Sequence, residues 1–276
     1  MSEPFPRGTG APTQSPLFWV ANKDRYMRQL LIRDIEQETG RDLLVYFADC
    51  DHSRAQIDQT DDIYLSELLS ASATDQIDLL IESNGGATDA TEKICAVLRS
   101  AGIDLRVIVP RRAKSNGTVI AFCGRSIIMG RESELGPIDP NVGDVPADFI
   151  VQSANILMAQ NPVLVHLAQA AILQTKTLAT ELLKTGMMRG LPETDIASVV
   201  EKLASRATYH SHGAVIDAME AQTLGLTVEL HNATSALWGK IWLLRSMYAF
   251  DCPQRGFGKL FESRKISSPV ARPQAS

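Results

Sequence analysis

The stretch IDLLIESNGGATDATEKICAVLRSAGIDLRVIVPRRAKSNGTVIAFC, residues 77–123, decides the fold. It contains two short apolar runs, 77–83 and 105–110, separated by a segment of helical character, 88–101. Short, continuous apolar runs that alternate with helices are typical of buried parallel strands joined by crossover helices. The stretch therefore predicts a strand–helix–strand unit, followed by a short helix from about residue 115.

The rest of the chain continues this alternation. We expect two further strands at 43–48 and 126–130, helices at 22–38, 61–72 and 234–249, an almost wholly helical region at 147–205, and a helix with a short strand at 217–230. Because the strands are apolar throughout, both faces of the sheet should be covered. The sequence predicts an α/β fold with a mainly parallel sheet, flanking helices and a helical C-terminal part.

Composition and charge exclude several classes of protein. The chain has 276 residues, of which 45% are hydrophobic and 21% charged, and this supports a sizeable core without metal or disulfide staples. A formal net charge of −5 predicts no general attraction to nucleic acid or to anionic lipid. No apolar run approaches the roughly 18 residues of a membrane span, and residues 1–16 lack the apolar core of a secretory signal. We expect a cytoplasmic protein without a membrane span.

Domain boundaries follow from the polar ends. We expect a disordered N-terminal segment at 1–20, one folded domain at 21–250 and a C-terminal tail at 251–276. The segment 234–249 carries Trp238 and Trp242, and Phe257 and Phe261 follow it. These aromatic residues either form a contact surface between subunits or cap the core.

The cysteines predict neither a disulfide framework nor a metal site. Cys50, Cys95, Cys123 and Cys252 form no CxxC pair, and no histidine stands at metal-ligand spacing from them. Reduced, buried thiols are the simplest interpretation. We therefore expect no metal and no cofactor.

Two turns carry the residues suited to chemistry, and each follows a buried strand. The first ends in Gly85-Gly86, and the second holds Ser115 and Asn116 at the start of a helix. Parallel strands deliver both turns to the carboxyl edge of the sheet, where such sheets bind ligands. Ser115 is then a candidate nucleophile, and the N–H groups of Gly86 and Asn116 are candidate oxyanion donors. The alternative is structural: a serine that caps its helix, and glycines that only permit a tight turn.

The order of these motifs resembles a known family. The glycine pair, the Lys-Ser-Asn-Gly-Thr helix start at 114–118, SELGPIDP at 133–140 and SHGAVI at 211–216 resemble the serine dehydrogenase proteinase family, over roughly residues 25–230. These are Clp/crotonase-fold serine peptidases related to signal peptide peptidase A. The resemblance implies a Clp/crotonase-like peptidase domain, a peptide or protein substrate and a homo-oligomer, because the family commonly builds rings.

Residue by residue, the resemblance implies that Ser115 is the nucleophile and that Gly86 and Asn116 supply the oxyanion donors. The family more often has a proline before the glycine pair and a small residue after the serine. Asn84 and Asn116 stand at those two places in this chain.

The general base has two candidates. Clp-type subunits have a histidine about two dozen residues after the serine, but this chain has GPIDP there, without histidine. Lys176 shares a helix face with apolar residues, so partial burial would favour its neutral form, unless the amine extends into solvent. His212 titrates near neutrality, although a histidine in the SHG turn can also be purely structural. Lys114, next to Ser115, is expected to point the other way.

Three functions remain open on the sequence. The first is a serine hydrolase, a peptidase that forms an acyl-enzyme on Ser115. The second is a crotonase-like enzyme that acts on acyl thioesters, for which two backbone N–H groups would suffice. The third is a non-catalytic binding or assembly module that keeps the fold.

Overall fold

The computed structural model describes residues 15–52 and 55–272. A seven-stranded sheet forms the centre, in the order β11-β10-β1-β2-β3-β5-β9. Five neighbouring strands run parallel: β1 (Asp42–Ala48), β2 (Gln76–Glu82), β3 (Asp104–Val109), β5 (Ile127–Met129) and β9 (Val228–Leu230). β10 (Phe257–Glu262) pairs antiparallel with β1, and β11 (Ser267–Ala271) pairs antiparallel with β10. The predicted α/β fold with a mainly parallel sheet is confirmed.

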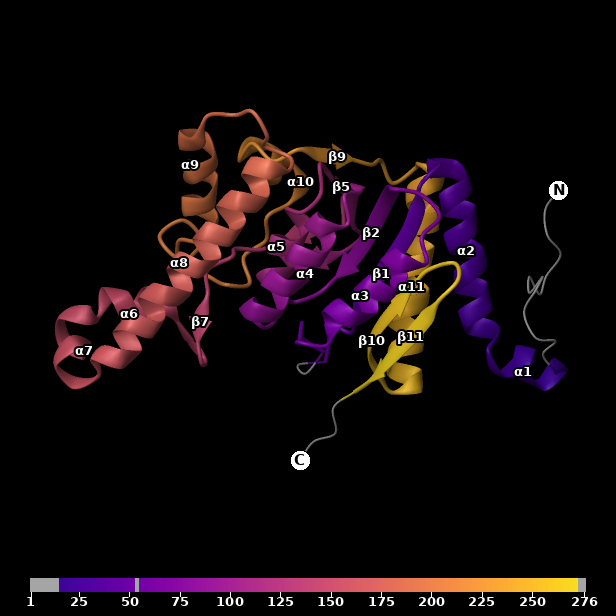
Figure 1. The fold of residues 1–276 in the computed structure, drawn as a ribbon, viewed down its shortest axis with the longest axis horizontal. Helices are drawn as coiled ribbons and strands as arrows, with labels where there is room; N and C mark the ends of the chain where they lie inside the picture. The colour runs from indigo at the N-terminus through magenta and orange to yellow at the C-terminus, as the bar shows by residue number, and fades with distance from the viewer. Residues whose placement is uncertain (1–14, 53–54, 273–276) are drawn as a thin grey trace.

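Helices cover both faces of this sheet (Figure 1). α2 (Lys23–Thr39) and α11 (Ala236–Arg255) pack on one face, where alternate side chains of β1 such as Val45 and Phe47 are buried. The other face is covered by α3 (Asp61–Ser70), α4 (Thr88–Ser100), α5 (Asn116–Ala121), α8 (Pro162–Thr185), α9 (Glu193–Leu203) and α10 (Ala218–Thr223). Burial on both faces explains why the strands read as continuous apolar runs.

A helical arm projects away from the sheet (Figure 1). It consists of α6 (Ala147–Gln152), α7 (Ala154–Gln160) and the first half of α8, packed around a small apolar core that includes Ile150 and Val165. Two pairs of two-residue strands complete the domain: β4 (Arg112–Ala113) with β6 (Glu134–Leu135), and β7 (Asn141–Val142) with β8 (Val145–Pro146). Ala113 of β4 also forms a bridge with Ser83, so β4 lies beside the segment that leads into the glycine turn.

The structure corrects both predicted ends of the chain. Residues 16–21 form a short helix, α1 (Pro16–Ala21), and are not disordered, whereas residues 1–14 lie outside the described part. The expected tail at 251–276 is wrong for 257–271, which form β10 and β11. The two charged residues of β10, Lys259 and Glu262, are buried in ion pairs, so they do not prevent burial of the strand.

The aromatic residues proposed as contact surface are mostly core. Trp238 is 2% exposed and Phe261 is 0% exposed, so both pack inside. Trp242 is half-buried, with the Arg245 guanidinium stacked on its ring, and Phe257 packs against the core at the edge of α11. Of the two interpretations offered by the sequence, the cap over the core therefore applies to Trp238 and Phe261.

Candidate active site

Ser115 occupies a strained turn between β4 and α5. Its backbone has φ 53° and ψ −122°, and it is the one non-glycine residue with positive φ in the described ranges. Such a conformation costs roughly 1–3 kcal/mol and persists only where the surrounding structure fixes it. A sharp strand-to-helix turn of this kind exposes the nucleophilic serine in α/β-hydrolases. The strain at Ser115 therefore makes this turn the candidate for the site.

The hydroxyl of Ser115 does not cap α5. Ser115 stands at the N-cap position, but its side chain makes no capping hydrogen bond to the helix. The capping explanation that the sequence left open is therefore wrong. The side chain is partly exposed and free of the usual structural task of a serine at this position.

The turn is held by bonds on either side of Ser115. The N–H of Gly117 donates to the carbonyl of Lys114 at 2.7 Å. The Thr118 hydroxyl lies 2.7 Å from the carbonyl oxygen of Ala113 and 2.9 Å from that of Gly136, and the Gly136 N–H lies 3.1 Å from the same hydroxyl. These contacts fix the start of α5 against the segment after β6, and so they hold the strained residue in place.

The glycine corner after β2 lies directly against this turn. A Cβ atom at Gly85 would lie 2.8 Å from the Cβ of Ser115 and 3.2 Å from the backbone nitrogen of Asn116. Gly85 also has φ 98°, which disfavours any side chain. A Cβ atom at Gly86 would lie 2.4 Å from the backbone nitrogen of Ile57. Only glycine permits this close approach, and the structure brings the two predicted turns together.

Two backbone N–H groups at the junction have no hydrogen-bond acceptor in the described part of the chain. Among the described residues, neither the N–H of Gly86 nor that of Asn116 donates a hydrogen bond, whereas the N–H of Gly85 donates to the Ser83 hydroxyl at 3.0 Å. Gly86 is partly exposed. Gly85 therefore supplies the close approach to Ser115, while Gly86 and Asn116 carry the free donors.

Asn84 and Asn116, the two residues that depart from the family pattern, form hydrogen bonds that stabilise the glycine corner. The Asn116 side-chain amide donates to the carbonyl of Gly86 at 2.6 Å and to the Thr88 hydroxyl at 3.2 Å. The Asn84 amide donates to the carbonyl of Cys50 at 2.6 Å. Both side chains thus secure the glycine corner, so the departures from the pattern add contacts at the site.

A buried lysine secures the outer side of the same corner. Ile57 pairs with the glycine corner. Its N–H donates to the Gly85 carbonyl at 2.9 Å, and its carbonyl accepts from the Ala87 N–H at 3.0 Å. The neighbouring Gln56 carbonyl accepts from the Lys259 ammonium at 3.0 Å, and Lys259 also lies 2.6 Å from carboxylate oxygens of Asp58 and Asp61. Strand β10 therefore anchors the segment that flanks the glycines.

His212 is paired with a buried carboxylate. Its Nδ1 lies 2.9 Å from Oδ1 of Asp139, and the other oxygen of Asp139 lies 2.6 Å from Nε of Arg206. Asp139 is 1% exposed, while the His212 side chain is 31% exposed. An imidazole held through one nitrogen by a buried carboxylate presents its other nitrogen as a proton acceptor. In the described part of the chain, no hydrogen bond joins His212 to the Ser115 hydroxyl.

Lys176 is engaged elsewhere. Its ammonium lies 2.6 Å from the Glu201 carboxylate, across the contact between α8 and α9. This ion pair directs the Lys176 ammonium toward α9. Within the described ranges, no bond joins Lys176 to Ser115. The structure thus brings Ser115 together with Gly85, Gly86 and Asn116, but it does not bring Lys176 to them.

Sequence reasoning missed Asp139 and Arg206. Asp139 lies inside the SELGPIDP motif, but nothing in the sequence indicates its partner, because His212 is 73 positions further along. Lys114 points away from Ser115, as expected: its ammonium contacts the carbonyls of Leu135 and Ala214. Burial lowers the pKa of this lysine, and the Glu134 carboxylate opposes that shift.

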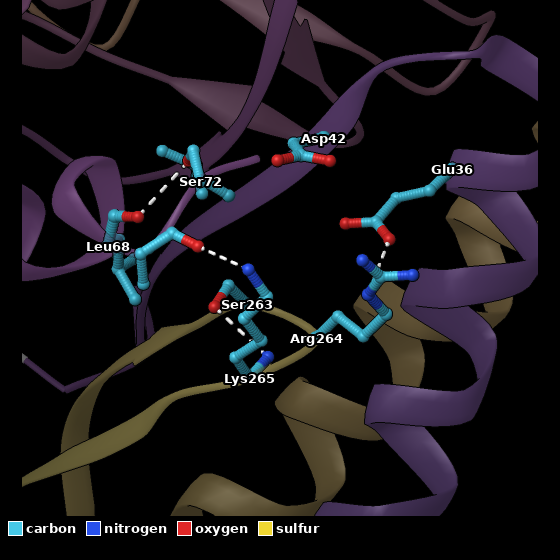
Figure 2. A pocket seen from close by; sticks show the side chains of 9 residues that line it. Glu36, Asp42, Leu68, Ser72, Ser263, Arg264 and Lys265 are labelled. Atoms are coloured by element: carbon cyan, nitrogen blue, oxygen red, sulfur yellow. Dashed lines mark hydrogen bonds and ion pairs between the residues drawn. The ribbon is translucent and has the colours of Figure 1, made fainter. Parts of the chain in front are cut away.

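A small depression at the other end of the sheet is separate from this site (Figure 2). It lies at the amino end of β1, beside Asp42, and an ion pair of 3.2 Å between Glu36 and Arg264 borders it. Lys265 donates to the carbonyl of Ala71 at 2.7 Å on its other side. Because Ser115 and the glycines follow the carboxyl ends of the parallel strands, this depression belongs to the opposite edge of the sheet.

Ser115, the glycine corner, Asp139 and His212 all lie within one match to a protein family. Residues 53–253 match the family of ClpP-like SDH-type serine proteinases. The chain belongs to this family. The predicted family resemblance is therefore confirmed.

Two relatives of this ClpP-like proteinase come from Methanocaldococcus jannaschii, and both are uncharacterized proteins. One is 31% identical over a region that covers 65% of this chain and 61% of the relative. The other is 34% identical over a region that covers 39% of this chain and 38% of the relative. The chain thus spans less than two thirds of the length of these curated relatives. A solved structure, the membrane-bound stomatin-specific protease 1510-N, has 18% identity and a TM-score of 0.45 over 67% of this chain and 79% of that protein.

Among residues 15–52 and 55–272, no cluster of three or more histidine, cysteine, aspartate or glutamate side chains is placed to hold a metal ion. No helix in the same ranges combines the length and hydropathy of a membrane span.

Proposed function

We propose that this chain is a serine peptidase in which Ser115 is the nucleophile, His212 is the general base and Asp139 orients His212. The N–H groups of Gly86 and Asn116 form the oxyanion hole. The observation that carries the proposal is the backbone of Ser115. A strained, uncapped serine against a glycine corner, with two free N–H donors beside it, is the arrangement that acyl transfer needs.

The reaction follows from these roles. Nε2 of His212 takes the proton of the Ser115 hydroxyl as Oγ forms a bond with the carbonyl carbon of a peptide. The carbonyl oxygen becomes an oxyanion that the Gly86 and Asn116 N–H groups stabilise, and loss of one such donor typically costs about 3–4 kcal/mol. The C–N bond then breaks, and the amine leaves with the proton from His212. Water hydrolyses the resulting acyl-enzyme by the same steps, and Oγ is protonated again.

His212 suits the role of base better than Lys176. Neutral imidazole is available near pH 7 without special burial, and Asp139 stabilises the imidazolium that forms during the reaction. The Arg206 guanidinium forms an ion pair with the other oxygen of Asp139 and so holds the carboxylate in place beside His212. Lys176 would first have to leave its ion pair with Glu201 and lose a proton. Serine peptidases commonly show longer catalytic hydrogen bonds before substrate binds, which accommodates the absent Ser115–His212 bond.

The crotonase-like alternative has less support. A thioester enzyme needs the two N–H donors but gains nothing from a strained serine whose hydroxyl is uncapped. A non-catalytic module likewise has no use for that strain. Both alternatives predict that the Ser115 hydroxyl reacts with a fluorophosphonate no faster than other exposed serines of the chain.

Homo-oligomer formation is part of the proposal, with the helical arm as the contact. Exposed apolar side chains gather on α6, α7 and the first half of α8: Phe149, Ile156, Met158, Val163 and Leu167. Val163 and Leu167 are 65% and 53% exposed and stand four positions apart, so they share one helix face. Contiguous exposed apolar surface of this kind marks contacts with other proteins.

The deciding experiment is labelling with a fluorophosphonate, which forms an Oγ–P bond and releases fluoride. We expect label on the peptide that contains Ser115, located by mass spectrometry, and none in Ser115→Ala. Ser70→Ala, a change of an exposed serine on α3, is the control and should label like the unmodified protein. Equal labelling of Ser115→Ala and the unmodified protein would refute the assignment.

A further inference from the structure

Lys114, the residue before the proposed nucleophile, is a buried charge. The residue is 9% exposed. Its ammonium has three N–H donors, and three acceptors surround it: the Leu135 carbonyl at 3.1 Å, the Ala214 carbonyl at 2.9 Å and the Glu134 carboxylate at 3.1 Å. Every donor of the ammonium is used, so the Lys114 side chain is committed to these three contacts and has no donor left for a substrate.

The two carbonyls belong to the two segments that carry the proposed base and its partner. Leu135 precedes Asp139 by four residues, and Ala214 follows His212 by two. The segments also pair directly, since the N–H of Leu135 donates to Ile216 at 2.9 Å and the N–H of Ile216 donates to Leu135 at 3.1 Å. Lys114 therefore lies where the Ser115 turn, the Asp139 segment and the His212 loop meet.

We infer that Lys114 is a positioning residue that sets the His212–Asp139 pair relative to Ser115. The inference rests on the proposed function. Ser115 and Lys114 are adjacent in the chain, so any shift of the His212 loop relative to the nucleophile must stretch the bond from the Lys114 ammonium to Ala214. A displacement of about 1 Å in an active site can cost on the order of a hundredfold in rate.

The packing around the lysine makes the tether stiff. A Cβ atom at Gly136 would lie 2.6 Å from Cδ of Lys114, so the side chain runs closely along the backbone of the 134–136 segment. The charged groups that face the ammonium are Glu134, which is in contact, and Arg112, which acts at longer range and lowers its pKa slightly further after burial. No short polar side chain could reach the same acceptors from position 114.

The test is the rate of fluorophosphonate labelling of Ser115 across pH 5–9. Lys114→Met keeps the length and removes the donors. We expect its labelling rate to fall by about tenfold to a hundredfold at pH 7 and the shape of the pH profile to change, because the proposed base is displaced from Ser115. Arg41→Met, which removes a buried ion pair with Asp78 at the amino edge of the sheet, is the matched control. It should lose stability but keep both the rate and the profile.

Glu134→Gln is a milder second variant, because it removes one ionic acceptor and keeps both carbonyl contacts. Glu134→Gln should change the labelling rate and its pH profile in the same direction as Lys114→Met, but by a smaller factor. If Lys114→Met does not fold, the result for Glu134→Gln decides whether the inference holds. Folded Lys114→Met with an unchanged rate and profile overturns the inference and leaves the peptidase proposal intact. Absence of label on Ser115 in the unmodified protein overturns the proposed function instead.

Discussion

The side-chain amide of Asn116 donates a 2.6 Å hydrogen bond to the carbonyl of Gly86, so the two residues that carry the free N–H groups are joined to each other. Gly86 comes from the turn after β2, and Asn116 comes from the first position of α5. The spacing of the two donors is therefore fixed by a side chain, in addition to the packing of Gly85 against Ser115.

Asn116→Ala should reduce activity while it retains the backbone donor. Without the amide, Gly86 loses its tie to α5, and the two N–H groups no longer hold a fixed separation. We expect a loss of about 1 kcal/mol in the free energy of unfolding, as for an ordinary hydrogen bond, and a larger proportional loss in labelling rate. Asn84→Ala, which removes an equally short bond to Cys50, is the control for stability and should affect the rate less.

Ser115→Gly should be more stable than Ser115→Ala. Glycine tolerates φ 53° and ψ −122°, whereas alanine retains the strain of a side chain there. We expect a difference of about 1 kcal/mol in the free energy of unfolding, measured by urea titration. Ser115→Ala itself should stay within about 1 kcal/mol of the unmodified protein, because no capping bond is lost. Equal stability of the two variants would contradict the strained turn.

His212→Ala should lower the labelling rate by about 10²–10⁴, the usual contribution of a general base. Lys176→Ala should leave the rate within about twofold, because its removal breaks only a surface ion pair with Glu201. The two variants decide between the bases that the sequence left open. If Lys176→Ala abolishes labelling and His212→Ala does not, the general base is Lys176 on α8.

Asp139→Asn should keep the fold and lose most of the rate. The amide preserves the shape of the side chain but removes the charge that orients His212 and stabilises its protonated form. The unpaired Arg206 guanidinium then lowers stability as well. The diagnostic is the labelling rate of the folded variant, which should fall far below that of the unmodified protein.

Lys114 predicts a pH dependence of stability. Burial lowers the pKa of its ammonium below the ordinary value of 10.5, so the unfolded chain binds more protons than the folded chain between that lowered pKa and 10.5. The free energy of unfolding therefore rises with pH in this window through this group. Lys114→Met should lack that contribution when urea titrations are compared across the window. Holding this ammonium costs stability, as expected of a residue kept for function.

Leu167→Glu should disrupt assembly through the helical arm. A carboxylate at a position that is 53% exposed costs the monomer little but opposes burial between subunits. Light scattering should show a smaller particle for the variant, and Glu92→Gln, an exposed change on α4, should leave the mass unchanged. An identical mass for Leu167→Glu would exclude this face of the arm as the contact.

The sequence predicted the central parallel strands of the sheet, because strands that are buried on both faces consist of continuous runs of apolar residues. β10 escaped prediction, since Lys259 and Glu262 appear solvent-directed until their buried partners, Asp61 and Arg28, are known. The meeting of Gly85 with Ser115 followed from parallel strand topology. The His212–Asp139 pair did not, because contacts between loops far apart in sequence have no periodic signal.

The backbone strain at Ser115 was likewise invisible in the sequence. It depends on how Thr118 and Gly136 hold the turn, and residue types alone do not reveal dihedral angles. The N-terminal helix α1 was missed because its flanking Pro, Gly and Ser residues dominate the local composition. In each of these cases the deciding information lies in long-range contacts.

The anchoring of Gln56 by Lys259 has a consequence for when a newly made chain acquires activity. Lys259 lies in the penultimate strand, yet it secures the segment that flanks Gly85 and Gly86. A nascent polypeptide still lacking that strand would have Ser115 and His212 already synthesised but no support behind the glycines. We expect such a chain to be inert on the ribosome, so that hydrolytic competence arises only once translation has passed residue 259.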